Sequence, residues 1–389
     1  MSLHPLTKAI RTQTKRTHEM EHSTPLFLTS SFCFETAEEM RAAFADETPD
    51  NIYSRFSNPT VDEFVNKMVE LEGAEAGIAT STGMSAVFAT FMALLKTGDH
   101  LLSCNAVFGS THNIITKYLP NYGIECSYVN ADKPGEWEAA IRPNTKMIYL
   151  ETPTNPGIDL IDIAFVAEIA KKHGIILNVD NCFATPVNQR PIEFGANIVL
   201  HSATKWIDGQ GRVLGGVIVG EKKLIESIYL FCRNTGPALS PFNAWVLSKS
   251  LETLDVRMER HAKNALHIAT ALEHHPKLSW LKYPYLPSHP QYDIATRQMK
   301  DGGGIVCFEL KGGLESGKKF LNSLELLSMT ANLGDSRSIA SHPASTTHGK
   351  LTEEERLEVN ITPGLIRISV GLEYADDILN DIVQALEKS

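Results

Sequence analysis

The sequence predicts an α/β fold: a mostly parallel sheet with helices on both faces, followed by a smaller α+β domain. Two observations support this prediction. Through the middle of the chain, short apolar segments alternate with amphipathic segments of helix length, which is typical of parallel sheets. The chain also has 389 residues, more than the roughly 250–300 that one hydrophobic core usually serves. We therefore expect an N-terminal arm (residues 1–60), a first domain (61–250) and a second domain (251–389).

The arm is rich in Ser, Thr and Pro and shows little periodicity, so we expect it to be extended and to lean on another surface. Helical periodicity begins at Thr60, which forms a capping box with Glu63, and the helix is expected to end at Gly73. A short strand at 77–80 follows. It leads into a helix that opens at Ser81.

Five further apolar segments are predicted to form strands: His100–Cys104, Glu125–Val129, Met147–Glu151, Ile175–Asp180 and Asn197–His201. Between the third and the fourth, Asp162–His173 repeats apolar residues at helical spacing and ends in a cationic segment before Gly174, which predicts an amphipathic helix. Ligands of such sheets bind beyond the carboxyl ends of the strands. The functional site is therefore expected where these strands end.

A long helical stretch, from about Pro241 to His274, is predicted to lead into the second domain. That domain is expected to combine three strands with two helices, as listed here: strands at 304–310, 326–330 and 365–370, and helices at 315–324 and 375–387.

Composition and charge exclude several classes of function. A net charge of −10 argues against nucleic acid or an anionic membrane as the main partner. No apolar segment approaches the eighteen or so residues of a membrane span, and no signal peptide is recognisable, so we expect a cytoplasmic protein. The six cysteines are scattered singly, which favours reduced thiols. The histidines lack the spacing of metal ligands, and no metal site is expected.

Lys205 is the most informative candidate residue. It follows an apolar segment, stands close after Ser202 and Thr204, and precedes a glycine-rich stretch. Upstream, Asp180 ends another apolar strand. A lysine for a Schiff base, an aspartate for a pyridinium nitrogen and hydroxyls for a phosphate are what pyridoxal 5′-phosphate (PLP) requires. Taken singly, a surface lysine and a capping aspartate are the commoner interpretations.

Other segments carry candidate binding residues, each with a plainer alternative. The helix start at Gly83 and Met84 suits an anion, although capping explains it equally well. Tyr53 and Arg55 point the same way in an extended segment and suit one phosphate, whereas an exposed arginine beside an aromatic ring is the alternative.

Two residues are candidates for binding the substrate. Arg367 interrupts an apolar strand; its partner is expected to be a substrate carboxylate or, equally, an aspartate in a structural salt bridge. Asn155 would be read as a turn residue on sequence grounds alone.

In this order, these segments resemble the Cys/Met-metabolism family of PLP-dependent enzymes, which includes cystathionine γ-synthase, methionine γ-lyase and the homoserine sulfhydrylases. The resemblance extends from about Thr24 to the C-terminus. It implies the aminotransferase-like PLP-dependent transferase fold, an amino-acid substrate, and a homotetramer built from two dimers. It also implies that Lys205 and Asp180 are catalytic residues that hold the cofactor.

The remaining roles follow from the same resemblance. Tyr53 and Arg55 would reach the phosphate of a neighbouring subunit, with Tyr53 also counted among the catalytic residues. Substrate binding would fall to Asn155, Arg367 and Asn332. The cofactor would be held within the subunit by further residues, of which Phe108 would stack on the ring: Gly83, Met84, Phe108, Ser202 and Thr204.

Within the family, four segments resemble the O-succinylhomoserine sulfhydrylases: 201–211, 236–245, 332–335 and 342–348. Phe108 stands where many members carry a tyrosine, and the loss of that phenol favours a carboxylate leaving group over a thiolate. Ala331 stands where cystathionine-handling relatives tend to carry a glutamate, which favours sulfide as the second substrate.

We therefore expect γ-replacement on O-succinylhomoserine by sulfide, giving homocysteine and succinate. O-Acetylhomoserine sulfhydrylase, methionine γ-lyase and cystathionine γ-synthase are the alternatives within the family. A non-catalytic protein with the same fold is disfavoured by the intact Lys205 and Asp180. A dehydrogenase is disfavoured because no GxGxxG motif follows the first strand.

Overall fold

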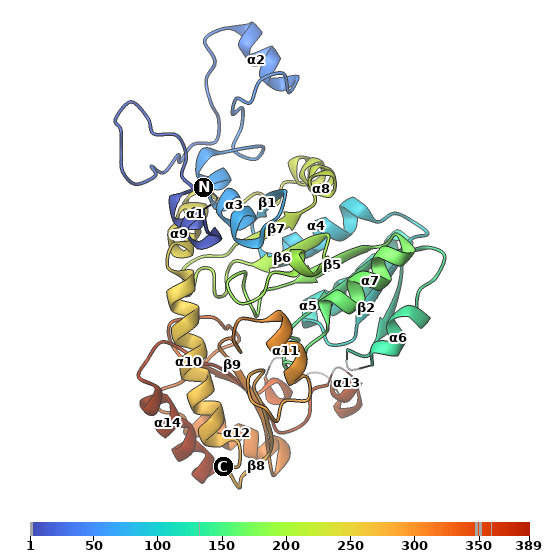
Figure 1. Cartoon of the computed structure of the whole chain (residues 1–389), viewed down its shortest axis with the longest axis vertical. Coiled ribbons are helices and arrows are strands. Elements are labelled where there is room, and N and C mark those ends of the chain that lie inside the picture. Colours follow the sequence, from blue (N-terminus) through green and yellow to red (C-terminus); the bar gives the residue numbers. More distant parts are fainter. Residues whose placement is uncertain (1–2, 132, 347–348, 350–351, 359) are drawn as a thin grey trace.

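The computed structural model describes residues 3–131, 133–346, 349, 352–358 and 360–389. Within these residues the chain forms two sheets (Figure 1). The larger has seven strands in the order β1-β7-β6-β5-β4-β2-β3. Their bounds are β1 (Ala76–Thr80), β2 (His100–Cys104), β3 (Glu125–Val129), β4 (Thr145–Glu151), β5 (Ile176–Asp180), β6 (Ile198–Ser202) and β7 (Gly216–Gly220). Only β7 pairs antiparallel with its neighbours, so the predicted mostly parallel sheet is confirmed.

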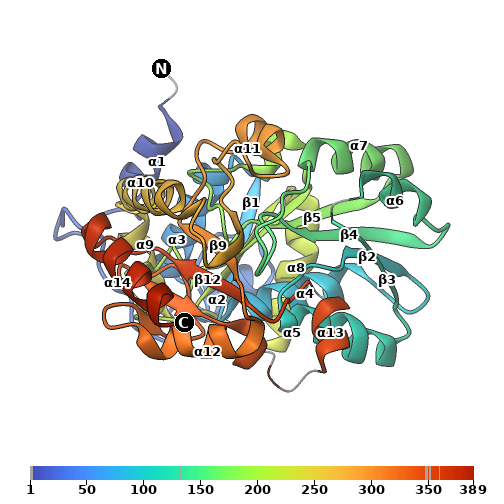
Figure 2. The ribbon, with the colours of Figure 1, turned by 90° about the horizontal axis from the view of Figure 1, so that it is seen from below.

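Helices cover both faces of this sheet. Seen from below, α7 lies on one side of the strands, and α4 and α8 lie on the other (Figure 2). The inner strands β2, β4 and β6 are almost wholly buried, as the continuous apolar segments of the sequence require. The helices of this part are α3 (Pro59–Glu72), α4 (Gly83–Leu94), α5 (Gly109–Asn113), α6 (Pro134–Ala139), α7 (Ile163–His173) and α8 (Lys222–Thr235), with short π- or 3₁₀-helical segments η1 (Ile114–Tyr118), η2 (Leu119–Tyr122) and η3 (Pro191–Phe194).

The second sheet has five strands among the described residues, in the order β10-β11-β12-β9-β8. Its elements are β8 (Leu278–Lys282), β9 (Ile305–Leu310), β10 (Ser328–Met329), β11 (Ile339–Ser341) and β12 (Leu365–Ser369), with helices α11 (Tyr292–Gln298), α12 (Gly313–Ser323), α13 (Glu353–Glu358) and α14 (Ala375–Lys388), and the short η4 (Pro343–Ser345). Phe308 of β9 and Phe320 of α12 meet edge to face in its core, with ring centroids 5.7 Å apart. The domain boundaries at 60 and 250 stay predictions.

Two helices, and not one, form the predicted helical stretch between the sheets. They are α9 (Pro241–Leu251) and α10 (Leu254–Leu272). Thr253 leaves helical geometry at the junction, and its hydroxyl donates to the Ser250 carbonyl oxygen. In the part of the chain that the structure describes, no helix is long and apolar enough to cross a membrane.

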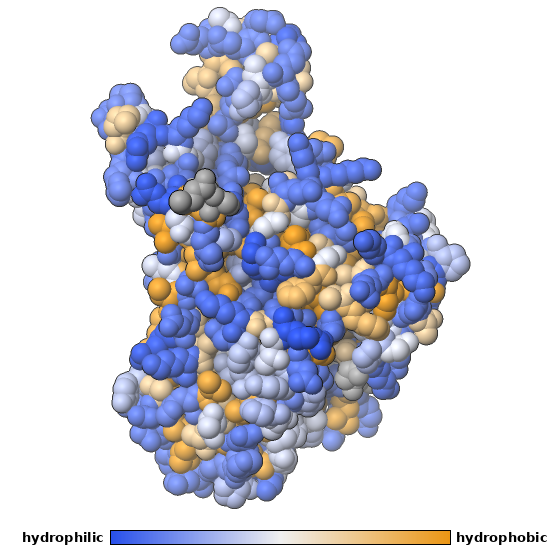
Figure 3. Space-filling model, in the orientation of Figure 1, coloured by the Kyte–Doolittle hydropathy of each residue, from blue (hydrophilic) through white to orange (hydrophobic). Residues whose placement is uncertain are grey.

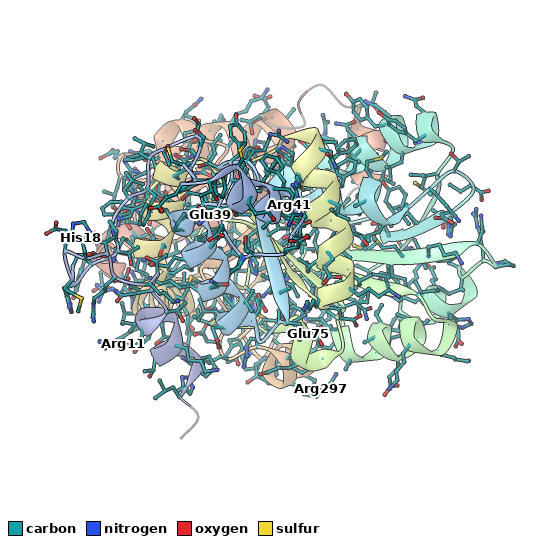
Figure 4. The ribbon with its side chains drawn as sticks, turned by 90° about the horizontal axis from the view of Figure 1, so that it is seen from above. Arg11, His18, Glu39, Arg41, Glu75 and Arg297 are labelled. Carbon is teal, nitrogen blue, oxygen red and sulfur yellow. The ribbon has the colours of Figure 1, made fainter. Side chains whose placement is uncertain are left out.

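The arm projects from the body and is not wholly extended, contrary to prediction (Figure 1). It contains α1 (Pro5–Arg11), which packs on α3, and α2 (Ala37–Phe44) at the far end. From above, the loop with His18 lies at the margin of the molecule, away from Glu39 and Arg41 of α2 (Figure 4).

The predicted capping box at Thr60 is wrong, because Pro59 already occupies the first helical position of α3 and Asn58 caps it. The Asn58 side chain accepts the Thr60 N–H. The Thr60 hydroxyl instead accepts the Phe27 N–H, and the Glu63 carboxylate accepts the Thr14 N–H at 3.0 Å. Both side chains therefore fasten the arm to the body.

Replacing Lys67 by methionine is expected to lower the free energy of unfolding by about 3–5 kcal/mol, because the buried Glu63 loses its cation. The fully buried Lys67 Nζ lies 3.2 Å from Glu63 Oε1 and 2.9 Å from Glu252 Oε1. Lys249 is the control, since it contacts the same Glu252 at 3.3 Å from a partly exposed position. Its replacement by methionine should cost less than about 1 kcal/mol in chemical denaturation. Equal losses would contradict the buried-pair interpretation.

Candidate active site

Polar side chains gather where β4, β5 and β6 end. Glu151 is the last residue of β4 and pairs in register with Asp180, the last residue of β5. Lys205 follows β6 by three residues, and Ser202 ends that strand. The carboxyl edge of the sheet thus carries the predicted Lys205, Asp180 and Ser202 together.

Lys205 points to the loop that precedes β11. Its Nζ donates a hydrogen bond to Asn332 Oδ1 at 2.6 Å. Burial, with a contribution from the Arg367 charge, lowers the pKa of the Lys205 ammonium. A larger share of this amine is therefore unprotonated at neutral pH than for an exposed lysine, which suits a nucleophile or a general base.

Arg367 and the neighbouring amides form the second half of the cluster. Arg367 is only 7% exposed; its Nη1 donates to Asn155 Oδ1 at 2.9 Å and its Nη2 to the Asn332 carbonyl oxygen at 3.3 Å. Its Nε is buried and finds no partner in the structure. No Asp or Glu pairs with Arg367 among the described residues, so of the two alternatives the geometry favours an external carboxylate.

Asp180 ends β5, between the strands that carry Glu151 and Ser202. Its Oδ1 accepts the Cys182 N–H at 2.9 Å, and burial raises the pKa of its carboxyl group. The Cys182 thiol in turn lies 3.7 Å from the Ser202 carbonyl oxygen. A half-buried carboxylate at this edge of the sheet is suited to a protonated ring nitrogen.

Gly83 and Ser202 form a narrow contact at the start of α4. A Cβ added to Gly83 would lie 2.6 Å from the Ser202 Cβ, and only a glycine lets the two backbones approach so closely. The N-terminus of this 12-residue helix therefore faces the strand that carries Ser202. Ser202 and the start of α4 fit the phosphate of PLP, and Lys205 and Asp180 fit its ring.

Two further predicted cofactor residues lie nearby in the sequence. Met84 lies in the first turn of α4. The Thr204 hydroxyl accepts the Gly215 N–H at 3.2 Å and donates to the Gly215 carbonyl oxygen at 3.3 Å.

Replacing Gly83 by valine is expected to weaken PLP binding about tenfold or more, because the added carbons enter the space beside Ser202. Gly135 in α6 is the control: a Cβ there meets no atom within 4 Å. Its replacement by valine should leave the affinity unchanged. Cofactor titration followed by absorbance measures both variants, and an unchanged affinity for G83V would contradict the predicted phosphate contact.

Phe108 immediately precedes the short α5, and the residue is 46% exposed. Its N–H donates to Glu151 Oε1 at 2.9 Å, which ties it to the end of β4. Stacking of this ring on the cofactor stays a prediction.

Tyr53 and Arg55 contact each other and the end of α8. The Arg55 guanidinium lies 5.5 Å from the Tyr53 ring centroid and donates to the Arg233 carbonyl oxygen at the end of α8. Within the described residues, no hydrogen bond, ion pair or ring contact joins either residue to Lys205 or Asp180. Their contact with a phosphate in a neighbouring subunit stays a prediction.

Three residues of the site escaped the sequence reasoning: Glu151, Tyr149 and Cys182. The Tyr149 hydroxyl lies 3.1 Å from Glu151 Oε1 and 3.5 Å from Asp180 Oδ2. The sequence did contain a signal for Glu151, because it is an acidic residue that ends an apolar strand, as Asp180 does. In the segment 342–348, Thr347 and His348 lie outside the described residues.

Known proteins resemble this chain along most of its length. Residues 6–387 match the family model described as Cys/Met metabolism PLP-dependent enzyme. An O-succinylhomoserine sulfhydrylase of Pseudomonas aeruginosa is 46% identical over 380 residues, covering 98% of this chain and 94% of that protein. An L-methionine gamma-lyase of Porphyromonas gingivalis is 44% identical, covering 94% and 92%. A solved structure assigned as O-acetylhomoserine (thiol)-lyase from Campylobacter jejuni, which carries N′-pyridoxyl-lysine-5′-monophosphate, superposes with a TM-score of 0.94 at 33% identity, covering 99% of this chain and 100% of that one.

Proposed function

Because the chain belongs to the Cys/Met metabolism PLP-dependent enzymes, we propose that it catalyses γ-replacement on O-succinylhomoserine with sulfide, giving homocysteine and succinate. PLP is the cofactor of this family, and the predicted aminotransferase-like fold is confirmed by the solved structures that the chain matches. The observation that carries the proposal is the group Lys205, Asn332, Arg367 and Asn155. A half-buried amine is linked there through Asn332 to a buried guanidinium that has a free N–H.

When bound, PLP supplies an electron sink for the negative charge that develops at the substrate α-carbon. Lys205 is the base that removes the α-proton, and its lowered pKa supports this role. The same amine then carries protons to and from the β-carbon. Asp180 holds a proton at the ring nitrogen, and Ser202 and the start of α4 hold the phosphate.

Arg367 binds the substrate carboxylate in this proposal. The two terminal nitrogens of the guanidinium donate hydrogen bonds to Asn155 and Asn332. These bonds orient the guanidinium before the substrate arrives. An α-amino acid would thereby place its α-carbon beside Lys205, because Asn332 contacts both residues.

The proposed identity of the γ-substituent and of the second substrate depends on two side chains. Phe108 offers no phenol to protonate a departing thiolate, whereas succinate leaves as a stable carboxylate without such help. Ala331 offers no charge for a distal ammonium group, which suits sulfide. The relative from Pseudomonas aeruginosa supports the same choice.

Turnover on O-succinylhomoserine and O-acetylhomoserine with sulfide, followed as homocysteine, tests the proposal. We expect a higher kcat/KM for the succinyl ester. A clear preference for the acetyl ester would overturn the assignment of the acyl group.

L-Methionine γ-lyase is the second candidate, because relatives with that activity are 42–44% identical to this chain. Such an enzyme would release 2-oxobutyrate and ammonia from methionine in the absence of sulfide. We expect this rate to be far below γ-replacement, and the converse would favour the lyase.

We also propose a cytoplasmic homotetramer, a dimer of dimers, in which the arm contacts a second copy. The arm projects above the body, and its surface mixes hydrophilic and hydrophobic side chains (Figure 3). Large apolar residues of the arm are exposed, among them Met20 (69%), Leu28 (69%) and Phe44 (49%). Contact with a neighbour would bring Tyr53 and Arg55 to that subunit's phosphate. Light scattering of the purified protein measures the assembly.

A further inference from the structure

Glu151 is a buried carboxyl group for which the proposed reaction gives no role. It is 6% exposed and lies beside Asp180 at the ends of two adjacent parallel strands. The groups that face it are all acids or hydrogen-bond donors. They are the Phe108 N–H, the Tyr149 hydroxyl from its own strand, Asp180 from β5, and the thiols of Cys104 and Cys182.

The hydrogen bonds of Tyr149 limit the charge that this pair can carry. Its hydroxyl has one proton, and it lies 3.1 Å from Glu151 Oε1 and 3.5 Å from Asp180 Oδ2. It can donate to only one of the two. If both carboxylates were ionised, two negative charges at adjacent strand ends would repel each other, and only one of them could accept the Tyr149 proton. One additional proton on the pair removes this conflict.

That proton belongs on Glu151. Burial raises the pKa of Asp180 as well, but its carboxylate accepts the Cys182 N–H, and a cationic ring nitrogen would stabilise its ionised form. Burial, together with the charge of Asp180, raises the pKa of Glu151 to about 8. At neutral pH the pair therefore keeps its one negative charge on Asp180.

We propose that Glu151 is a positioning residue: as a neutral acid it anchors the Phe108 backbone and leaves Asp180 as the one charge that faces the cofactor ring. This inference rests on the cofactor placement proposed above. The anchor works through Oε1, which accepts the Phe108 N–H at 2.9 Å. Glu151 thereby connects the residue expected to cover the ring with the residue expected to meet its nitrogen.

Three variants distinguish the hydrogen bond that Glu151 accepts from Phe108 from the charge that Glu151 carries. E151Q keeps a neutral acceptor at the same place, E151A removes the acceptor, and E151D withdraws it from Phe108. Glu309 supplies matched controls, because on β9 it likewise accepts one backbone N–H, from Gly364 at 3.0 Å, and one hydroxyl, from Thr362. The readouts are the PLP dissociation constant and the pH titration of the absorbance of the bound cofactor.

We expect E151A and E151D to weaken PLP binding about tenfold, since the Phe108 N–H loses the acceptor that holds it to the end of β4. E151Q should bind PLP as wild type does and titrate within about 0.3 pH unit of it, because no charge is removed. E309Q and E309A should match wild type in both measurements.

Either of two results would overturn the inference. Unchanged affinity in E151A and E151D would show that Glu151 anchors nothing. A titration midpoint lowered by about one pH unit in E151Q would show that the native group is an anion, since removing a nearby anion lowers the pKa of a cationic acid. If wild type itself bound no PLP, the proposed function would fail instead.

Discussion

Replacing Lys205 by alanine is expected to lower turnover by about 10⁴-fold or more and to remove the covalently held cofactor. The reason is that one amine both attaches PLP and moves the protons of the reaction. Its environment supports this double role, because burial lowers the pKa of the ammonium and Asn332 orients it at 2.6 Å. Steady-state kinetics and the visible absorbance of the purified variant measure the two effects.

The control is the exposed Lys223 at the start of α8, whose replacement by alanine should leave both measurements unchanged. A K205A enzyme that kept its colour and more than about one hundredth of the activity would contradict a role as both base and attachment point.

Replacing Arg367 by methionine is expected to lower kcat/KM by about 10²–10³-fold, because the substrate carboxylate loses its charged partner. The same change should leave the thermal stability equal or higher, since a buried guanidinium without a carboxylate partner is costly to fold. Kinetics and thermal denaturation of one preparation test both expectations.

R367K is the matched control, because it keeps the charge but loses the planar fork. It should recover only part of the activity, since Asn155 and Asn332 bind two separate nitrogens of the native guanidinium. A large loss of stability in R367M with little change in kcat/KM would assign Arg367 to the structure and not to the substrate.

The sequence indicated the strands of the large sheet well where each was continuously apolar. It missed β7, whose glycines at 216 and 220 pack against backbone: an added Cβ at Gly216 would lie 2.2 Å from the Thr82 carbonyl oxygen. Such glycines weaken the strand signal although the tertiary structure requires them. The helix α8 and the strand β8 were missed as well. The capping box failed because the helix actually starts one residue earlier, at Pro59.

Some residues of the candidate site could be chosen from the sequence, but their contacts could not. Lys205 and Asp180 could be chosen because each has the chemistry that PLP requires and each lies at or just after the end of an apolar strand. The link from Lys205 through Asn332 to Arg367 crosses more than a hundred residues and depends on how the two sheets pack, which no local pattern records. Glu151 became visible only when the strand order placed β4 beside β5, in register with Asp180.

Reduction of the purified protein with borohydride, followed by digestion and mass spectrometry, tests most directly that the cofactor is held by Lys205. We predict one pyridoxyl phosphate group on the peptide that contains Lys205, and none in K205A. Label on another lysine, or a wild-type protein without label, would contradict the assignment of this site.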